Sequence, residues 1–164
     1  MVLTKAELLA QLQKDARVVV HLAGKATPEM HDYRPTTGQR SMLELLRYIS
    51  MMGPTLAALI HKGTFDEADW GAAEAAAKSR TFDQAVAAIG SHGQQYADLL
   101  AAYSDDDLRS EVDMFGVATR GAHLANWVLN GCMAYRMQLF LYLKSCGRTE
   151  LNTMNLWAGI DGGN

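Results

Sequence analysis

Apolar residues recur at three- and four-residue intervals along most of the chain, the spacing that places them on one face of an α-helix. This pattern predicts four long helices. Their expected limits are Thr4 to Gly24, Ser41 to about His61, Thr81 to Tyr103, and about Gly121 to Ser145. Four long helices joined by loops are typical of an all-α protein built as a four-helix bundle.

Local signals refine these limits. A threonine or serine followed three residues later by glutamate or glutamine forms a capping box, and three helices begin in this way: Thr4–Glu7, Ser41–Glu44 and Thr81–Gln84. Inside the second helix, Gly53-Pro54 predicts a kink, because proline removes one helical hydrogen bond and clashes with the preceding turn.

The segments between and after the long helices are shorter. Residues 66–79 read as a short alanine-rich surface helix, and residues 104–120 form the longest stretch without a regular pattern. In the tail, Leu156 and Trp157 are expected to fold back over one end of the bundle, since exposed tryptophan is costly. The last three residues, Gly-Gly-Asn, are expected to be disordered.

Composition indicates one ordinary globular domain covering residues 1–164. Hydrophobic residues make up 49% and charged residues 20% of the chain. The net charge of −3 provides no basic surface for nucleic acid, and no apolar run approaches the roughly 20 residues that span a bilayer. The start of the chain lacks the features of a signal peptide. We therefore expect a cytoplasmic protein that binds neither nucleic acid nor membranes.

The polar residues form no recognised metal or cofactor motif. Cys132 and Cys146 lie 14 positions apart on one predicted helix, about 21 Å along its axis, so they are expected to be free thiols. None of the five histidines is spaced i, i+4 from another. The acidic clusters coincide with helix starts, where carboxylates cap backbone amides. No metal and no cofactor is expected.

One face of the last long helix is unusual. Trp127, Tyr135, Gln138 and Tyr142 fall on the same side as Gly131, a glycine that costs about 1 kcal/mol relative to alanine in a helix interior. This face is either an aromatic core stripe or the wall of a small-molecule pocket. Several of the nine methionines lie on the second and fourth helices, where they either fill the core or form a dimer face.

The segments SMLELLRYIS, LANWVLNGCMAYRMQLFLYLKSCG and LNTMNLWAGID resemble the DinB/YfiT-like superfamily of bacterial four-helix bundles. With the number of helices and the order of the loops, the resemblance covers most of the chain. It implies a DinB-like bundle with a short extra helix and a C-terminal tail packed on the bundle.

The resemblance also locates a metal site. Metal-binding members have a histidine on the second helix and HxxxH on the fourth, the second histidine opening a His-Arg-Gly-Gln motif. The matching positions here are Tyr48, Gly131 and Tyr135, while Arg136 and Gln138 match the arginine and glutamine. Neutral tyrosine, with a pKa of about 10, is a poor ligand for divalent metals, and glycine has no side chain. The usual metal site is therefore expected to be empty.

Two hypotheses of function follow. In the first, the chain is a metal-free DinB-like module that binds a small molecule or another protein, most simply as a homodimer. Tyr48 and Tyr135 would face each other across a cleft, Gly131 would leave space beside them, and Trp127 and Gln138 would line the same cleft.

In the second, the chain resembles the thiol-dependent S-transferases and isomerases of the family, with its metal relocated or dispensed with. In those relatives the metal would hold a thiolate by lowering the pKa of the thiol. A substitute site would need other ligands, for example His21 or His123 together with Glu44.

Overall fold

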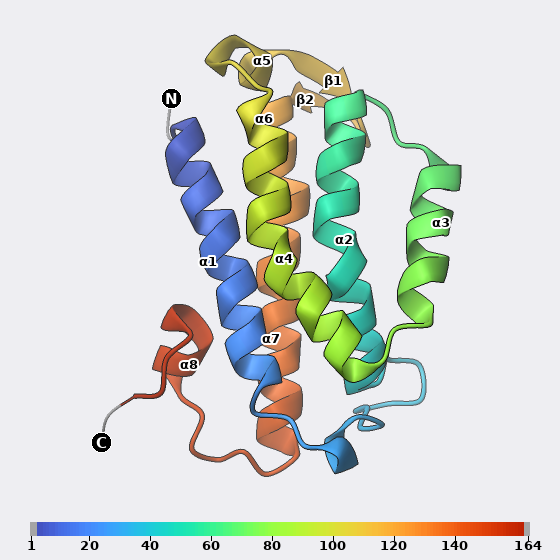
Figure 1. Cartoon of the computed structure of the whole chain (residues 1–164), viewed down its shortest axis with the longest axis vertical. Coiled ribbons are helices and arrows are strands. Elements are labelled where there is room, and N and C mark those ends of the chain that lie inside the picture. Colours follow the sequence, from blue (N-terminus) through green and yellow to red (C-terminus); the bar gives the residue numbers. More distant parts are fainter. Residues whose placement is uncertain (1–2, 163–164) are drawn as a thin grey trace.

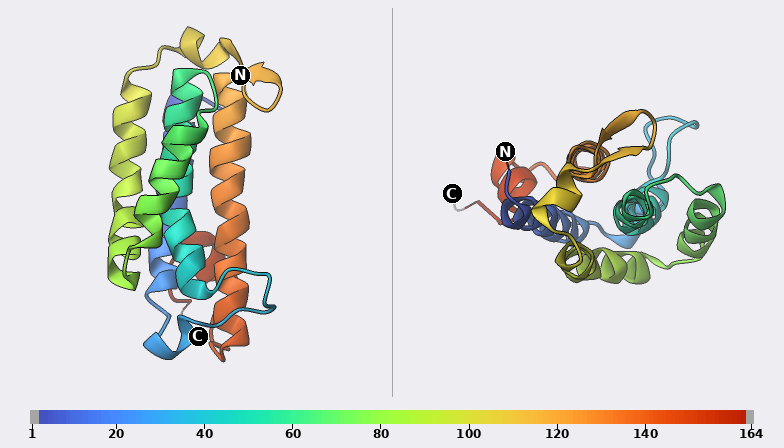
Figure 2. Two further views of the ribbon diagram at one scale, coloured as in Figure 1. Left: turned by 90° about the vertical axis from the view of Figure 1, so that its right-hand side faces the viewer. Right: turned by 90° about the horizontal axis from the view of Figure 1, so that it is seen from above.

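Four long helical segments form a bundle in the computed structural model, which describes residues 3–162 (Figure 1). They are α1 (Lys5–Ala23), α2 (Met42–Lys62), α4 (Phe82–Ala101) and a composite last helix made of α6 (Arg120–His123), the π-helix η2 (Leu124–Leu129) and α7 (Asn130–Ser145). Around the bundle, α1 packs against α4 and α7, and α2 packs against the same two helices (Figure 2). The predicted all-α four-helix bundle is confirmed.

The expected helix signals form as the sequence indicates. All three predicted capping boxes are present, at Thr4, Ser41 and Thr81. Gly63 ends α2 with a φ of 86°, and Gly147 follows α7 with a φ of 94°. Both glycines adopt the left-handed backbone region that side chains with a Cβ atom rarely enter. Local chemistry therefore sets the ends of these helices.

The short segments differ in part from the prediction. The surface helix is confirmed as α3 (Glu67–Lys78), which packs on the outer side of α2. The stretch 104–120 is more regular than expected. It contains α5 (Asp105–Arg109) and an antiparallel hairpin of β1 (Glu111–Asp113) with β2 (Val117–Thr119), in which Val112 pairs with Ala118. Strands of three residues are too short to show a reliable two-residue alternation.

The tail packs on the flank of the bundle, against α1 and α7, and not over an end (Figure 1). Its helix α8 (Thr153–Ala158) buries Leu156, as expected, but Trp157 is half exposed. The Arg136 guanidinium lies 5.3 Å from the centre of the Trp157 ring. This cation–π contact gives the ring a partner in its exposed position. Of the three residues predicted to be disordered, 162–164, the last two lie outside the described residues.

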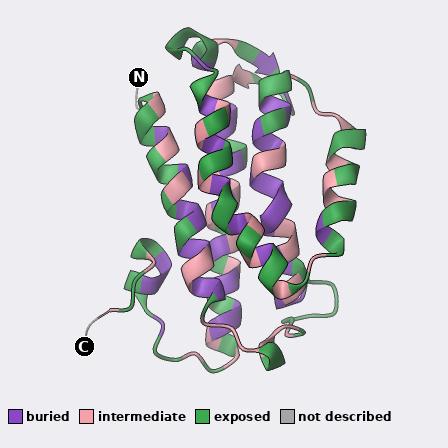
Figure 3. Ribbon diagram, viewed as in Figure 1, coloured by how far each residue is buried: buried purple, intermediate pink, exposed green. Residues whose placement is uncertain are grey.

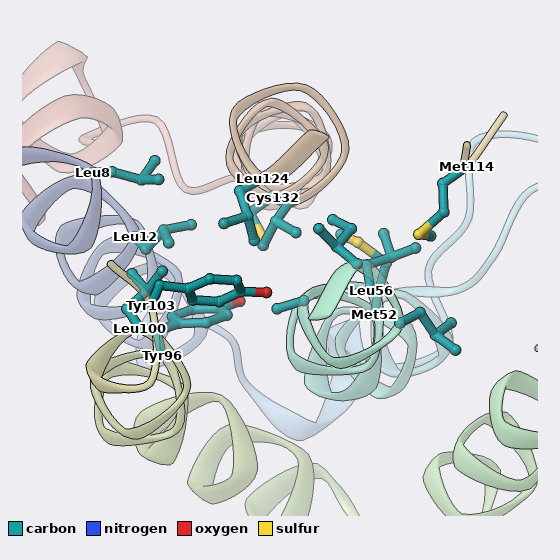
Figure 4. Close-up of a cluster of buried hydrophobic side chains, with 14 of the residues drawn as sticks. Leu8, Leu12, Met52, Leu56, Tyr96, Leu100, Tyr103, Met114, Leu124 and Cys132 are labelled. Carbon is teal, nitrogen blue, oxygen red and sulfur yellow. The ribbon is translucent and has the colours of Figure 1, made fainter. Parts of the chain in front are cut away.

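Apolar side chains fill the space between the four helices, and buried positions face inward along each of them (Figure 3). Tyr96 and Tyr103 reach from α4 and its C-terminal end into the space between α1, α2 and α7 (Figure 4). Within residues 3–162, α2 is the one helix long and apolar enough to cross a membrane, and most of that stretch is buried. Its central place in the bundle accounts for these properties.

Pro54 lies inside α2, which continues as a helix from Met42 to Lys62. Because proline has no N–H group, the carbonyl of Ser50 loses its helical partner. Two side chains replace it: Arg80 Nη1 donates to this oxygen at 3.0 Å, and His92 Nε2 lies 3.2 Å away. The proline therefore leaves the Ser50 carbonyl free to accept hydrogen bonds from His92 of α4 and from Arg80, just before α4. These contacts join α2 to α4.

His92 should make the protein less stable as the pH falls. Burial, with Arg80 nearby, lowers the pKa of His92 to about 4 from the usual 6.5. The unfolded chain therefore binds more protons at this residue between these values, and the contribution of His92 to the free energy of unfolding should drop by about 2 kcal/mol from pH 7 to pH 5. Urea titrations of the wild type and His92→Gln at both pH values test this. This contribution should be absent from His92→Gln, and equal pH dependence of the two proteins would contradict the prediction.

Candidate functional site

Two of the predicted site residues meet between α2 and α7. The rings of Tyr48 and Tyr135 lie edge to face with their centres 5.0 Å apart. Trp70 of α3 packs on the same ring of Tyr48 at 6.3 Å. Burial, followed by the neighbouring Tyr135 hydroxyl, raises the pKa of Tyr48 to about 12. Tyr48 is therefore a neutral ring held in place by two other rings.

Gln138, a third predicted site residue, is linked to Arg40 through Tyr142. Its Nε2 donates to the Tyr142 hydroxyl at 2.6 Å, and this hydroxyl donates to the Arg40 backbone carbonyl at 3.0 Å. The Arg40 guanidinium then lies 3.9 Å from the centre of the Tyr48 ring. Three predicted residues thus converge on one arginine: Tyr48 supports its side chain, Tyr135 supports Tyr48, and Gln138 helps to hold its backbone.

A cavity of about 450 Å³ opens beside Tyr48 and Arg40. The 34–40 loop, the first half of α2 and the end of α3 surround it. Four cationic and two acidic side chains line this cavity: Arg34, Arg40, Arg47, Lys78, Glu44 and Glu74. The excess of two positive charges contrasts with the net charge of −3 for the whole chain. We call this cavity the Tyr48 pocket.

Both carboxylates of the Tyr48 pocket are already engaged. Glu44 accepts a hydrogen bond from the Ser41 backbone N–H at 2.7 Å and pairs with Arg34 at 3.2 Å. These contacts, the Ser41 bond foremost, lower the pKa of Glu44, which is therefore ionised near neutral pH. Glu74 pairs with Lys78 at 3.4 Å.

Arg40 and Arg47 have no such partner. Among residues 3–162, no carboxylate lies within 4.0 Å of either guanidinium. The Nε of Arg47 donates a hydrogen bond to the Arg80 carbonyl at 2.6 Å. Its two terminal nitrogens make no hydrogen bond to any of residues 3–162. The pocket thus presents guanidinium N–H groups that are available to a bound anion.

The other two predicted residues lie elsewhere. Trp127 is partly exposed, and its ring neighbour is Phe115 of the β1–β2 hairpin, 5.1 Å away. Gly131 faces Met52, whose side-chain atoms lie 3.5 and 3.6 Å from where a Cβ atom would be. The expected gap beside the two tyrosines is therefore occupied by a methionine.

The side chains at the positions assigned to metal ligands do not fit a divalent metal. Tyr48 stays protonated near neutral pH, and Gly131 presents only backbone against an apolar side chain. Within residues 3–162, no three His, Cys, Asp or Glu side chains are grouped so that they could hold a metal ion. The chemistry of the Tyr48 pocket is that of guanidinium groups and an aromatic ring.

The structure also separates the residues considered for a relocated metal. His21 lies 3.2 Å from the Asn155 amide at α8, and His123 contacts the Val112 carbonyl in the hairpin. Glu44 caps α2. Cys132 and Cys146 are both free, and burial raises the pKa of the Cys132 thiol to about 12. These residues form no shared site.

Arg40 and Arg47 are the two pocket arginines without a carboxylate partner, and the sequence predicted neither as a site residue. The segment RPTTGQR, residues 34–40, has an arginine at each end of a turn containing proline and glycine. It directly precedes the capping serine of α2, so its second arginine must lie near the start of that helix. The position of Arg40 just before the capping serine is the one sequence signal for its role. Using it requires knowing that Tyr48 lies on the side of α2 that faces Arg40.

The structure is a four-helix bundle with a cationic pocket beside Tyr48, between α2 and α3. A solved structure, the DinB-like protein YjoA of Bacillus subtilis, is similar to this chain with a TM-score of 0.68. The match has 20% sequence identity and covers 88% of this chain and 95% of the other. No protein-family model matches the chain, and no curated protein matches it significantly. The predicted DinB-like fold is confirmed.

Proposed function

We propose that this DinB-like protein is a binding module for small acidic molecules, which it takes up in the Tyr48 pocket. The observation that supports the proposal is the cluster of four cationic side chains, two of which have no carboxylate partner. The pocket volume of about 450 Å³ lies within the range of small-molecule sites. The homodimer expected from the sequence stays a prediction.

Guanidinium groups suit this task because each presents N–H donors in a planar fork that matches a carboxylate or phosphate. Arg40 is held at two points, by the Tyr48 ring and through its backbone carbonyl. Holding the side chain in place lowers the entropy that binding must overcome. The neutral Tyr48 adds no competing negative charge.

Replacing Arg40 with alanine should weaken the binding of an acidic probe by at least about tenfold, the loss expected for one charge-assisted interaction. Phenyl phosphate is a suitable probe, and isothermal titration calorimetry in low salt measures its affinity. Benzyl alcohol, which has a ring but no charge, should bind far more weakly to the wild type.

Arg109→Ala is the matched control, because Arg109 is exposed at the other end of the bundle and pairs with Asp106. This variant should bind phenyl phosphate like the wild type. The proposal is wrong if the wild type does not bind the probe, or if Arg40→Ala and Arg109→Ala change its affinity equally.

A further inference from the structure

The Tyr48 pocket has an apolar floor as well as a cationic rim. Met51 and Ala77 line it beside Tyr48, and both are almost fully buried, with exposures of 3% and 2%. Ligand sites of this kind combine an apolar lining with a few polar groups that fix orientation. The pocket is therefore built for a molecule with an apolar body and an acidic group.

The contact between Arg40 and Tyr48 favours a flat body. The guanidinium lies over the face of the Tyr48 ring at 3.9 Å, and the Arg40 residue is otherwise exposed. Guanidinium groups stack on aromatic faces, so a planar ligand can stack against the side of Arg40 that faces away from Tyr48. A puckered body of the same size cannot make this contact over its whole surface.

The ring of Tyr48 is fixed in orientation. Tyr135 packs on it from α7 at 5.0 Å with an interplanar angle of 69°, and Trp70 packs on it from α3 at 6.3 Å with an angle of 65°. Rings prefer such edge-to-face pairs. With Tyr48 held in this way, the ring that supports the Arg40 guanidinium has a fixed position.

Building on the proposed function, we propose that the acidic ligand is an aromatic acid, a flat ring bearing a carboxylate or phosphate. Its acidic group binds the terminal N–H groups of Arg47. Its ring stacks on the Arg40 guanidinium above the floor formed by Met51 and Ala77. Tyr48 is a positioning residue that sets the preference for a ring by supporting the Arg40 guanidinium from the other side.

Benzoate and cyclohexanecarboxylate test this proposal, since they have the same charge and nearly the same size but differ in flatness. Calorimetric titration of the wild type should give an affinity for benzoate about two- to fivefold higher, the effect expected of one exposed stacked guanidinium. In Tyr48→Leu the ratio should fall towards one, while Tyr48→Phe, which keeps the ring, should retain it. Thermal unfolding of each variant shows whether it folds. If Tyr48→Leu does not fold, the ratio of the two affinities in the wild type tests the proposal by itself.

The outcomes separate the two proposals. Equal binding of both acids by the wild type, with loss of both in Arg40→Ala, overturns the preference for aromatic acids and leaves acid binding intact. Failure of the wild type to bind either acid or phenyl phosphate overturns both. A ratio that survives in Tyr48→Leu shows that Tyr48 does not set the preference.

Discussion

Replacing Asp15 with asparagine is expected to lower the free energy of unfolding by about 3–5 kcal/mol, the cost of leaving one member of a buried ion pair alone. Asp15 of α1 pairs with Arg136 of α7, and the two residues are only 3% and 5% exposed. Asparagine has nearly the same shape but no charge, so it leaves a cation in the core. Arginine cannot lose its proton to escape this cost. Urea denaturation followed by circular dichroism measures the change.

Removing the other partner, Arg136, should cost less stability at low pH than at high pH. In Arg136→Met the remaining Asp15 can take up a proton, and burial already raises its pKa to about 6. Arg136→Met should therefore be more stable at pH 5 than at pH 8, relative to the wild type. The double variant Asp15→Leu/Arg136→Met should recover most of the loss, because an apolar pair replaces the ions. Losses that simply add in the double variant would contradict this account.

Gly53→Ala should destabilise the protein by about 3 kcal/mol, the upper end for overpacking a core. A Cβ atom on Gly53 would overlap the Tyr96 hydroxyl oxygen and lie 3.2 Å from the Cys132 sulfur. Tyr96 is 2% exposed, so its ring cannot easily move away. The glycine in the middle of α2 thus gives space to the tyrosine hydroxyl. Thermal and urea unfolding of the variant measure the effect.

Gly90→Ala provides the matched control. Gly90 also lies inside a helix, α4, but nothing is within 4 Å of where its Cβ would be. This variant should gain up to about 1 kcal/mol from helix propensity. Adding Tyr96→Phe to Gly53→Ala removes the overlapping oxygen and should restore much of the stability. If Gly53→Ala is as stable as Gly90→Ala, the close contact with Tyr96 does not constrain the fold.

The long helices could be predicted because their signals are local. Capping boxes and the apolar period depend only on residues within a few positions of each other, and these gave the starts at Thr4, Ser41 and Thr81. The hairpin could not be predicted in this way, because its pairing joins Glu111 to Thr119 through strands of three residues. Its stability depends on contacts with the rest of the fold.

The candidate site could be predicted only in part, for a similar reason. The rings of Tyr48 and Tyr135 meet because both helices are regular there, whereas Gln138 bonds to Tyr142, and of these three residues only Tyr48 lines the pocket. Trp127 lies in η2, a π-helical segment with i→i+5 hydrogen bonds. Each turn of η2 therefore holds more residues than a turn of α7, which changes the direction of the Trp127 side chain. A regular helical projection therefore misplaces it. Arg40 lies in a loop, where spacing along the chain does not determine direction.

The central claim is that the Tyr48 pocket is the ligand site, and a crystal structure of the protein with benzoate tests it most directly. We expect the benzoate ring against the Arg40 guanidinium and its carboxylate within hydrogen-bond distance of Arg47. Benzoate bound instead in the groove between α1 and α4, beside Gly90 and Gly93, with the Tyr48 pocket holding only water, would contradict it.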